Sequence, residues 1–139
     1  MLELKQINKY YNQGTVNEMC LFEDFSLTIR DRQFVSVVGS NGSGKTSMLN
    51  IICGSIPLDS GRIIIGGKDI TSMPEYKRQR RIGRVYQNPA MGTCPHMTIL
   101  ENMALADNKG KPFNLLPGTN RQRINYYKEQ LHSLGLGLE

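Results

Sequence analysis

Alternating apolar and polar positions near the start of the chain predict two β-strands. Leu2, Leu4 and Ile7 mark one face of an edge-type first strand. Residues 25–29 alternate strictly, as expected of an antiparallel strand with one buried face. A nearly continuous apolar run follows at 34–38, which is typical of a short strand buried on both faces. The pattern therefore predicts three strands before the first helix.

The spacing becomes helical after residue 45. Apolar residues at 48, 49, 51 and 52 predict a helix over 46–53, which Gly54 ends. Further along, the pattern predicts a strand at 62–65, a hairpin turn at Gly66-Gly67, a return strand at 68–70, one or two helical turns within 74–80 and a short strand at 82–86. This order places an antiparallel sheet beside an α/β core.

Two helix-start signatures occur in the last third of the chain. Thr98 and Glu101 form a capping box that opens a helix through Ala106. Thr119 and Gln122 predict a second capping box. Its helix carries an apolar stripe and stops at Gly135; the stripe consists of Ile124, Tyr127, Leu131 and Leu134. Residues 109–118 predict a loop rich in Gly, Pro and Lys.

Between the apolar run and the first helix lies G-x-x-x-x-G-K-T, the phosphate-binding P-loop pattern. The motif and the residue after it are Gly39, Ser40, Asn41, Gly42, Ser43, Gly44, Lys45, Thr46 and Ser47. Glycines let the backbone wrap a phosphate closely, and the amides of the first helical turn face the same anion. Lys45 can reach the β- and γ-phosphates, and the Thr46 hydroxyl is placed to bind Mg²⁺. The motif predicts a site for a nucleotide with Mg²⁺.

Composition says less about the partner. The 139 residues have a net charge of +5, which suits nucleotide phosphates, nucleic acid or an anionic membrane surface. No apolar run approaches the length that spans a membrane. Cys20, Cys53 and Cys94 are scattered, which predicts free thiols in a reducing compartment and gives no zinc-ligand spacing.

The order of these parts resembles the nucleotide-binding subunit of an ABC transporter. Residues 4–11 resemble that family's first strand and aromatic A-loop, and residues 21–29 its second strand. Residues 39–47 match its Walker A motif. Residues 81–89 resemble its Q-loop, and residues 97–102 are similar to the M-T-V-x-E-N segment that follows the Q-loop. The resemblance covers essentially the whole chain, and within the family it is nearest to a bacterial importer group.

The resemblance implies a role for particular residues toward ATP and Mg²⁺. Tyr11 would stack on the adenine ring, with Tyr10 as the alternative because a slip of one residue exchanges them. Gln87 would contact Mg²⁺ or the attacking water and report to the membrane subunit. Lys45 and Gln87 are therefore the candidate catalytic residues, and Thr46 and Gln87 the candidate metal contacts.

The same resemblance implies parts that these residues do not contain. The family's signature sequence, Walker B aspartate, catalytic glutamate and switch histidine have no match here. We expect a truncated P-loop cassette: residues 1–94 would form the antiparallel subdomain and P-loop core to the Q-loop, and 95–139 the start of a helical subdomain. Implied partners are a second nucleotide-binding subunit, head to tail, and membrane permease subunits at the cytoplasmic face of the membrane. The 139 residues alone are expected to be inactive in ATP hydrolysis and marginally soluble.

Other readings of the pattern remain. A small GTPase is disfavoured because no N-K-x-D motif follows Asp107-Asn108-Lys109-Gly110, and a P-loop kinase because it would begin with the P-loop strand. A soluble ABC-type protein acting on nucleic acid or the ribosome would use the basic run of Lys77, Arg78, Arg80, Arg81 and Arg84. Such a run is more often a solvated face, so nucleic acid is the less favoured partner. A non-catalytic nucleotide-binding module is a further alternative.

Overall fold

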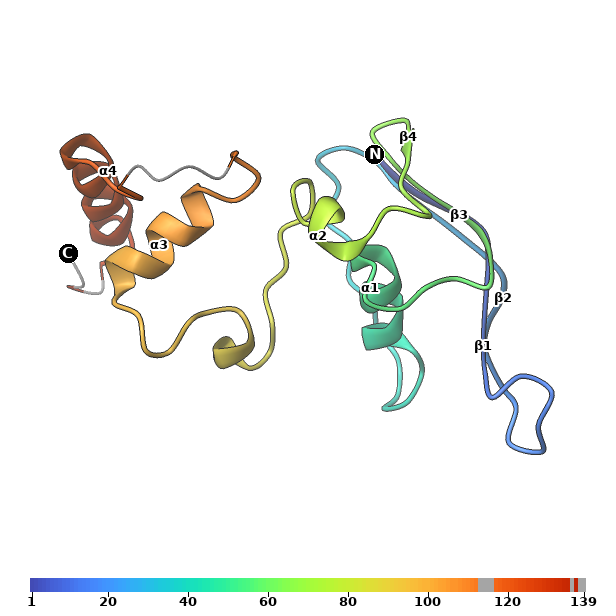
Figure 1. Ribbon diagram of the computed structural model, residues 1–139. Coiled ribbons are helices and arrows are strands. Elements are labelled where there is room, and N and C mark those ends of the chain that lie inside the picture. Colours follow the sequence, from blue (N-terminus) through green and yellow to red (C-terminus); the bar gives the residue numbers. More distant parts are fainter. Residues whose placement is uncertain (113–116, 136, 138–139) are drawn as a thin grey trace. The chain divides into compact units, whose positions relative to one another are not determined.

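The computed structural model describes residues 1–112, 117–135 and 137. It divides into two compact units, Met1–Ile82 and Gly83–Glu139, and each is described by itself. The first unit contains β1 (Leu2–Tyr11), β2 (Met19–Ile29), α1 (Lys45–Cys53), β3 (Ser60–Ile65), β4 (Lys68–Asp69) and α2 (Glu75–Arg78). The second contains the 3-10 turn η1 (Pro89–Met91), α3 (Ile99–Asp107) and α4 (Arg121–His132) (Figure 1). Within the described ranges, no helix has the length and apolar character needed to cross a membrane.

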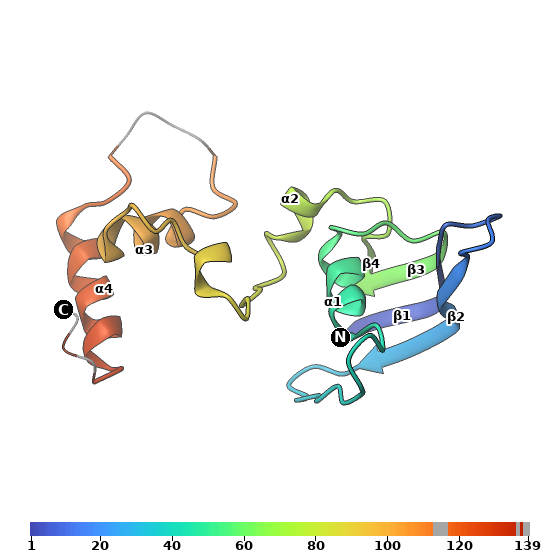
Figure 2. The same ribbon diagram turned by 90° about the horizontal axis from the view of Figure 1, so that it is seen from below.

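The four strands form one antiparallel sheet in the order β2-β1-β3-β4 (Figure 2). β1 pairs with β2 on one side and with β3 on the other, for example through Leu4 with Leu27 and Ile63. The expected edge position of the first strand is therefore wrong. Alternation reveals which face of a strand is buried, but it carries no information on how many neighbours the strand has.

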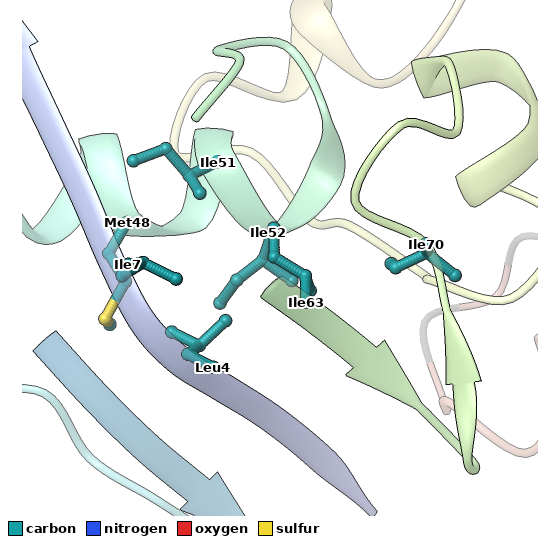
Figure 3. Close-up of a cluster of buried hydrophobic side chains, with 7 residues drawn as sticks. All are labelled: Leu4, Ile7, Met48, Ile51, Ile52, Ile63 and Ile70. Atoms are coloured by element: carbon teal, nitrogen blue, oxygen red, sulfur yellow. The ribbon is translucent and has the colours of Figure 1, made fainter. Parts of the chain in front are cut away.

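The core forms where α1 packs on one face of this sheet (Figure 3). Its buried members come from β1, α1, β3 and the residue after β4: Leu4, Ile7, Met48, Ile51, Ile52, Ile63 and Ile70. A bulge at Gln6, whose φ is 47°, inserts one residue between Leu4 and Ile7 and so keeps both on the helix-covered face. Removing these side chains from water is the main force that fixes α1 on the sheet.

Several predicted elements are confirmed. The strand at 25–29 is the end of β2, and the strand at 62–65 lies within β3. Gly66 and Gly67 both have positive φ, 55° and 76°, as a two-residue hairpin turn requires. The first helix ends at Gly54, whose amide closes the last turn on Asn50 and Ile51.

Two predicted strands are absent from the described residues. The run at 34–38 has no strand structure; Phe34 and Val38 are 93% and 91% exposed. Residues 82–86 likewise form no strand, and Val85 is exposed. A strand buried on both faces depends on neighbouring strands for its backbone hydrogen bonds. None of the four described strands pairs with either run, so apolar character alone does not make either of them a strand.

Arg78 departs from the expected solvated basic face. It is only 4% exposed, and its guanidinium donates hydrogen bonds to four backbone carbonyls. The acceptors are Ile51 at 2.9 Å, Ile52 at 3.1 Å, Met73 at 2.7 Å and Thr71 at 2.7 Å. Burial lowers the pKa of Arg78, yet an arginine stays charged at any physiological pH. The side chain therefore ties the C-terminus of α1 to the segment that leads into α2.

The second unit is built from two capped helices. The capping box of Thr98 and Glu101 is present, and α3 runs to Asp107, one residue further than predicted. The second predicted box is wrong: Asn120 is the N-cap of α4, and its side chain accepts from the Arg123 amide. Asn120 is itself a preferred N-cap residue, so the helix starts one residue later. Of the predicted loop, residues 113–116 lie outside the described residues.

Asp107 joins α3 to α4. Its carboxylate accepts a hydrogen bond from the Tyr127 hydroxyl at 3.0 Å and forms ion pairs with Arg123 at 3.2 Å and Lys111 at 3.3 Å. Tyr127 is the buried residue of α4. The predicted stripe of this helix therefore contributes one buried aromatic residue and a polar contact rather than a wide apolar face.

Replacing Arg78 with methionine should lower the free energy of unfolding of the first unit by about 2–4 kcal/mol, because it leaves buried carbonyls at the end of α1 without donors. The exposed Arg80→Met is the matched control and should change it by less than about 0.5 kcal/mol. Urea unfolding followed by far-ultraviolet circular dichroism measures both. Equal stability of the two variants would contradict the structural role of Arg78.

The contact between α3 and α4 should depend on pH. The hydrogen bond from Tyr127, and then the contacts with Lys111 and Arg123, hold the pKa of Asp107 below its usual value. The stabilisation is therefore complete above the ordinary carboxyl pKa of about 3.9 and is lost as pH falls through the lower value of the folded state. Near-ultraviolet circular dichroism of the tyrosines should show this acid transition, and Asp107→Asn should remove it. The exposed Glu129→Gln should retain it; an identical acid response in all three proteins would refute the assignment.

Candidate nucleotide-binding site

The predicted P-loop residues form a tight loop that leads directly into α1. Gly42 and Gly44 have left-handed backbone angles, with φ of 84° and 86°. The Ser43 amide donates to the Ser40 carbonyl at 3.2 Å and closes a turn between them. Every residue of the loop is exposed or half-buried. The loop is thus open to a ligand, and its backbone takes a form that favours glycine at two positions.

The N-terminus of α1 has amide groups available to an anion. Gly44 is the N-cap, and no side chain among the described residues caps this end. The first helical hydrogen bond runs from the Met48 amide to the Gly44 carbonyl at 2.8 Å. The amides of residues 45–47 precede it and point away from the helix along its positive end. This arrangement suits a phosphate oxygen.

The Lys45 ammonium lies over the loop itself. It donates to the carbonyls of Gly39 at 2.8 Å and Ser40 at 2.6 Å, and lies 3.5 Å from the Ser43 hydroxyl. These contacts hold the charge at the loop, where a phosphate oxygen can replace a carbonyl as acceptor. Thr46, in the first turn of α1, is exposed, so its hydroxyl is accessible. In P-loop proteins a Ser or Thr hydroxyl at this position binds Mg²⁺ together with the phosphate oxygens of the nucleotide.

The end of the loop packs against β2. A Cβ atom on Gly44 would lie 3.0 Å from the Leu21 side chain and 3.4 Å from that of Phe22. Phe22 pairs with Lys9 of β1, and the pairing continues through Tyr10 with Cys20 and Tyr11 with Met19. The P-loop therefore lies beside the strand segment that leads to the two candidate tyrosines.

The faces of β1 distinguish the two tyrosines. Ile7 belongs to the core that α1 covers, and Lys9, two residues further along the strand, is buried as well. Side chains two residues apart share a face, so Tyr11 lies on this face and Tyr10 on the opposite one. The Lys9 ammonium, 5.7 Å from the centroid of the Tyr11 ring, agrees with this arrangement. Tyr11 is thus the tyrosine on the P-loop side of the sheet.

Gln87 belongs to the second unit, where it is exposed and precedes η1. Tyr11 and residues 39–47 thus belong to the first unit and Gln87 to the second, and each unit is described by itself. Sequence reasoning missed two residues near Tyr11: Lys9 and Asp59, whose side chains form an ion pair at 2.9 Å. The available signal was a lysine at the inward-facing position between Ile7 and Tyr11.

Comparison with known sequences agrees with the geometry. The family described as ABC transporter matches residues 22–137. The chain is 42% identical over 139 residues to a tyrosine transport ATP-binding protein of Clostridioides difficile, covering all of this chain and 55% of that protein. It is 43% identical over 104 residues to the spermidine/putrescine import ATP-binding protein PotA of Haemophilus influenzae, covering 75% of this chain and 26% of PotA. The chain thus spans about half the length of the first relative and about a quarter of the second.

Solved structures show the same fold. A dimeric ATP-binding cassette in a post-hydrolysis state, bound to ADP and Pi, superposes with a TM-score of 0.74 at 27% identity, over 95% of this chain and 56% of that one. A nucleotide-free cassette from an ABC transporter gives a TM-score of 0.63 at 26% identity, over 93% and 46%. The match over most of the sequence agrees with two features of the structure, the antiparallel sheet and the glycine loop before α1. The chain belongs to the ATP-binding proteins of the ABC transporter family.

Proposed function

We propose that this chain carries the ATP-binding P-loop of an importer ATPase, and that the whole protein couples ATP hydrolysis to uptake of a small nitrogen-containing solute such as an amino acid. The observation that carries the proposal is the open glycine loop, with uncapped helix amides and the Lys45 ammonium gathered at one point. The transport relatives support the solute class by similarity.

Each part of the site has a task in nucleotide binding. The amides of residues 45–47 bind phosphate oxygens, and Lys45 exchanges its carbonyl contacts for the β- and γ-phosphates. Thr46 offers its hydroxyl to Mg²⁺, and bound Mg²⁺ would neutralise charge on the phosphates. Tyr11 would stack on the adenine ring, and Gln87 would contact the metal or the attacking water.

The proposed assembly has two such subunits, placed head to tail, and membrane permease subunits at the cytoplasmic face of the membrane. ATP would favour the closed pair of subunits, and closure would be passed to the permease through the region around Gln87. The 139 residues carry the phosphate site but no residue that we can assign as the general base. Binding without turnover is therefore the expected behaviour of this chain.

Lys45→Ala should weaken ATP binding at least about tenfold, because it removes the loop's cation from the phosphates. Titration with a fluorescent ATP analogue in Mg²⁺ measures binding, and phosphate release is assayed in the same samples. Lys68→Ala, at the exposed β3–β4 hairpin, is the charge-matched control and should bind like the unmodified chain. No sample should release phosphate.

Three results would count against this proposal. Equal binding by Lys45→Ala and the unmodified chain would place the nucleotide elsewhere. Phosphate release that requires Lys45 would show that a general base lies within residues 1–139. Steeply salt-dependent DNA binding through the basic run, without ATP dependence, would favour the nucleic-acid alternative.

A further inference from the structure

Lys9 is a buried cation next to the tyrosine that is proposed to stack on the base. Only 8% of the residue is exposed, although lysine is among the residues least often buried. Its ammonium donates a hydrogen bond to Asp59 at 2.9 Å and lies 5.7 Å from the centroid of the Tyr11 ring. Both side chains extend from the same face of β1.

Asp59 holds this arrangement from the loop before β3. One carboxylate oxygen accepts from Lys9, and the other accepts from the Tyr10 amide at 2.7 Å. The Asp59 amide in turn donates to the Asn8 carbonyl at 3.1 Å. The hydrogen bond from Tyr10, and then that from Lys9, lower the pKa of Asp59, so the carboxylate is charged at neutral pH. A single side chain thus binds both the backbone next to Tyr11 and the cation beside its ring.

This fixation matters because Tyr11 is the last residue of its strand. Asn12 follows with a left-handed φ of 53°, and the hairpin loop at 12–18 is exposed. β1 and β2 continue side by side to this loop (Figure 1). A half-buried aromatic side chain at such a position loses rotamer freedom when it binds a partner, unless neighbouring groups have already ordered it.

We propose that Lys9, anchored by Asp59, is a positioning residue for recognition of the adenine base. The ammonium beside the ring orders the Tyr11 side chain before the nucleotide arrives, and the part of the ring that stays open receives the base. This inference rests on the proposed function of Tyr11 and residues 39–47. It assigns Lys9 no contact with the phosphates, so its effect should depend on the presence of a base.

The test compares two probes, ATP and inorganic tripolyphosphate, each with Mg²⁺, by equilibrium titration of the 139-residue chain. Lys9→Met keeps the apolar stem and removes the charge. It should weaken ATP binding about threefold to tenfold and leave tripolyphosphate binding within about twofold. Lys9→Arg should retain most of the ATP affinity. Tyr11→Ala should also weaken ATP binding selectively, and adding Lys9→Met to it should cause little further loss.

Lys5→Met is the matched control, because Lys5 also lies on β1 but its side chain is 54% exposed. It should change neither affinity. Asp59→Asn gives a second test should Lys9→Met fail to fold, and it should show the same selective loss for ATP. Circular dichroism of each variant verifies that the sheet is retained.

The outcomes separate this inference from the proposed function. Selective loss of ATP binding in both Tyr11→Ala and Lys9→Met supports the inference and the proposed function alike. Loss in Tyr11→Ala alone overturns the role of Lys9 and leaves the proposed site intact. Equal loss of ATP and tripolyphosphate in Lys9→Met overturns it too, since the lysine would then act through the fold or the net charge. Unchanged ATP binding in Tyr11→Ala refutes the stacking role, and the inference falls with it.

Discussion

The packing of α1 on the antiparallel sheet is the constraint on which the site depends. Ile51 and Ile52 of the helix belong to the same buried cluster as Leu4, Ile7 and Ile63 of the sheet, and this packing fixes the axis of α1. Because the P-loop is continuous with the first turn of α1, fixing the helix also fixes the direction of its free amides. The phosphate site is therefore a consequence of an apolar core that contains none of its residues.

The two ends of α1 have complementary electrostatic surroundings. The N-terminus has no side-chain cap within the described residues and directs its positive end at the loop. The carbonyls of Ile51 and Ile52, near the other end, receive the buried guanidinium of Arg78. A cation near the C-terminus and an anion at the N-terminus are the two favourable placements along a helix dipole. Arg78 provides the cation, and a bound ligand can provide the anion.

The sequence revealed those parts of the fold that depend on short-range rules. The glycine motif, the Gly66-Gly67 turn, the box at Thr98 and the end of α1 at Gly54 all follow from local backbone requirements, and the structure has them. The family could also be identified from the sequence, because several motifs in a fixed order, rather than one, carried the resemblance.

The wrong predictions concern contacts between parts of the chain that are distant in sequence. The run at 34–38 was predicted as a strand on apolar character, but pairing requires a neighbour that the described residues do not provide. The central place of β1 and the burial of Arg78 are long-range facts of the same kind. So is the ion pair of Lys9 and Asp59, whose partners lie 50 residues apart. A pattern along the chain can indicate which side chains are buried, but not which distant groups satisfy them.

The central claim is that the nucleotide binds at the loop before α1, and backbone amide NMR of the chain tests it most directly. Addition of ATP with Mg²⁺ should shift the amide resonances of residues 40–47, and tripolyphosphate should shift the same set, because these amides contact phosphate. The amides of β4, at the far edge of the sheet, should stay in place. Unshifted resonances at 40–47 with shifts concentrated in the basic segment 77–84 would contradict the account.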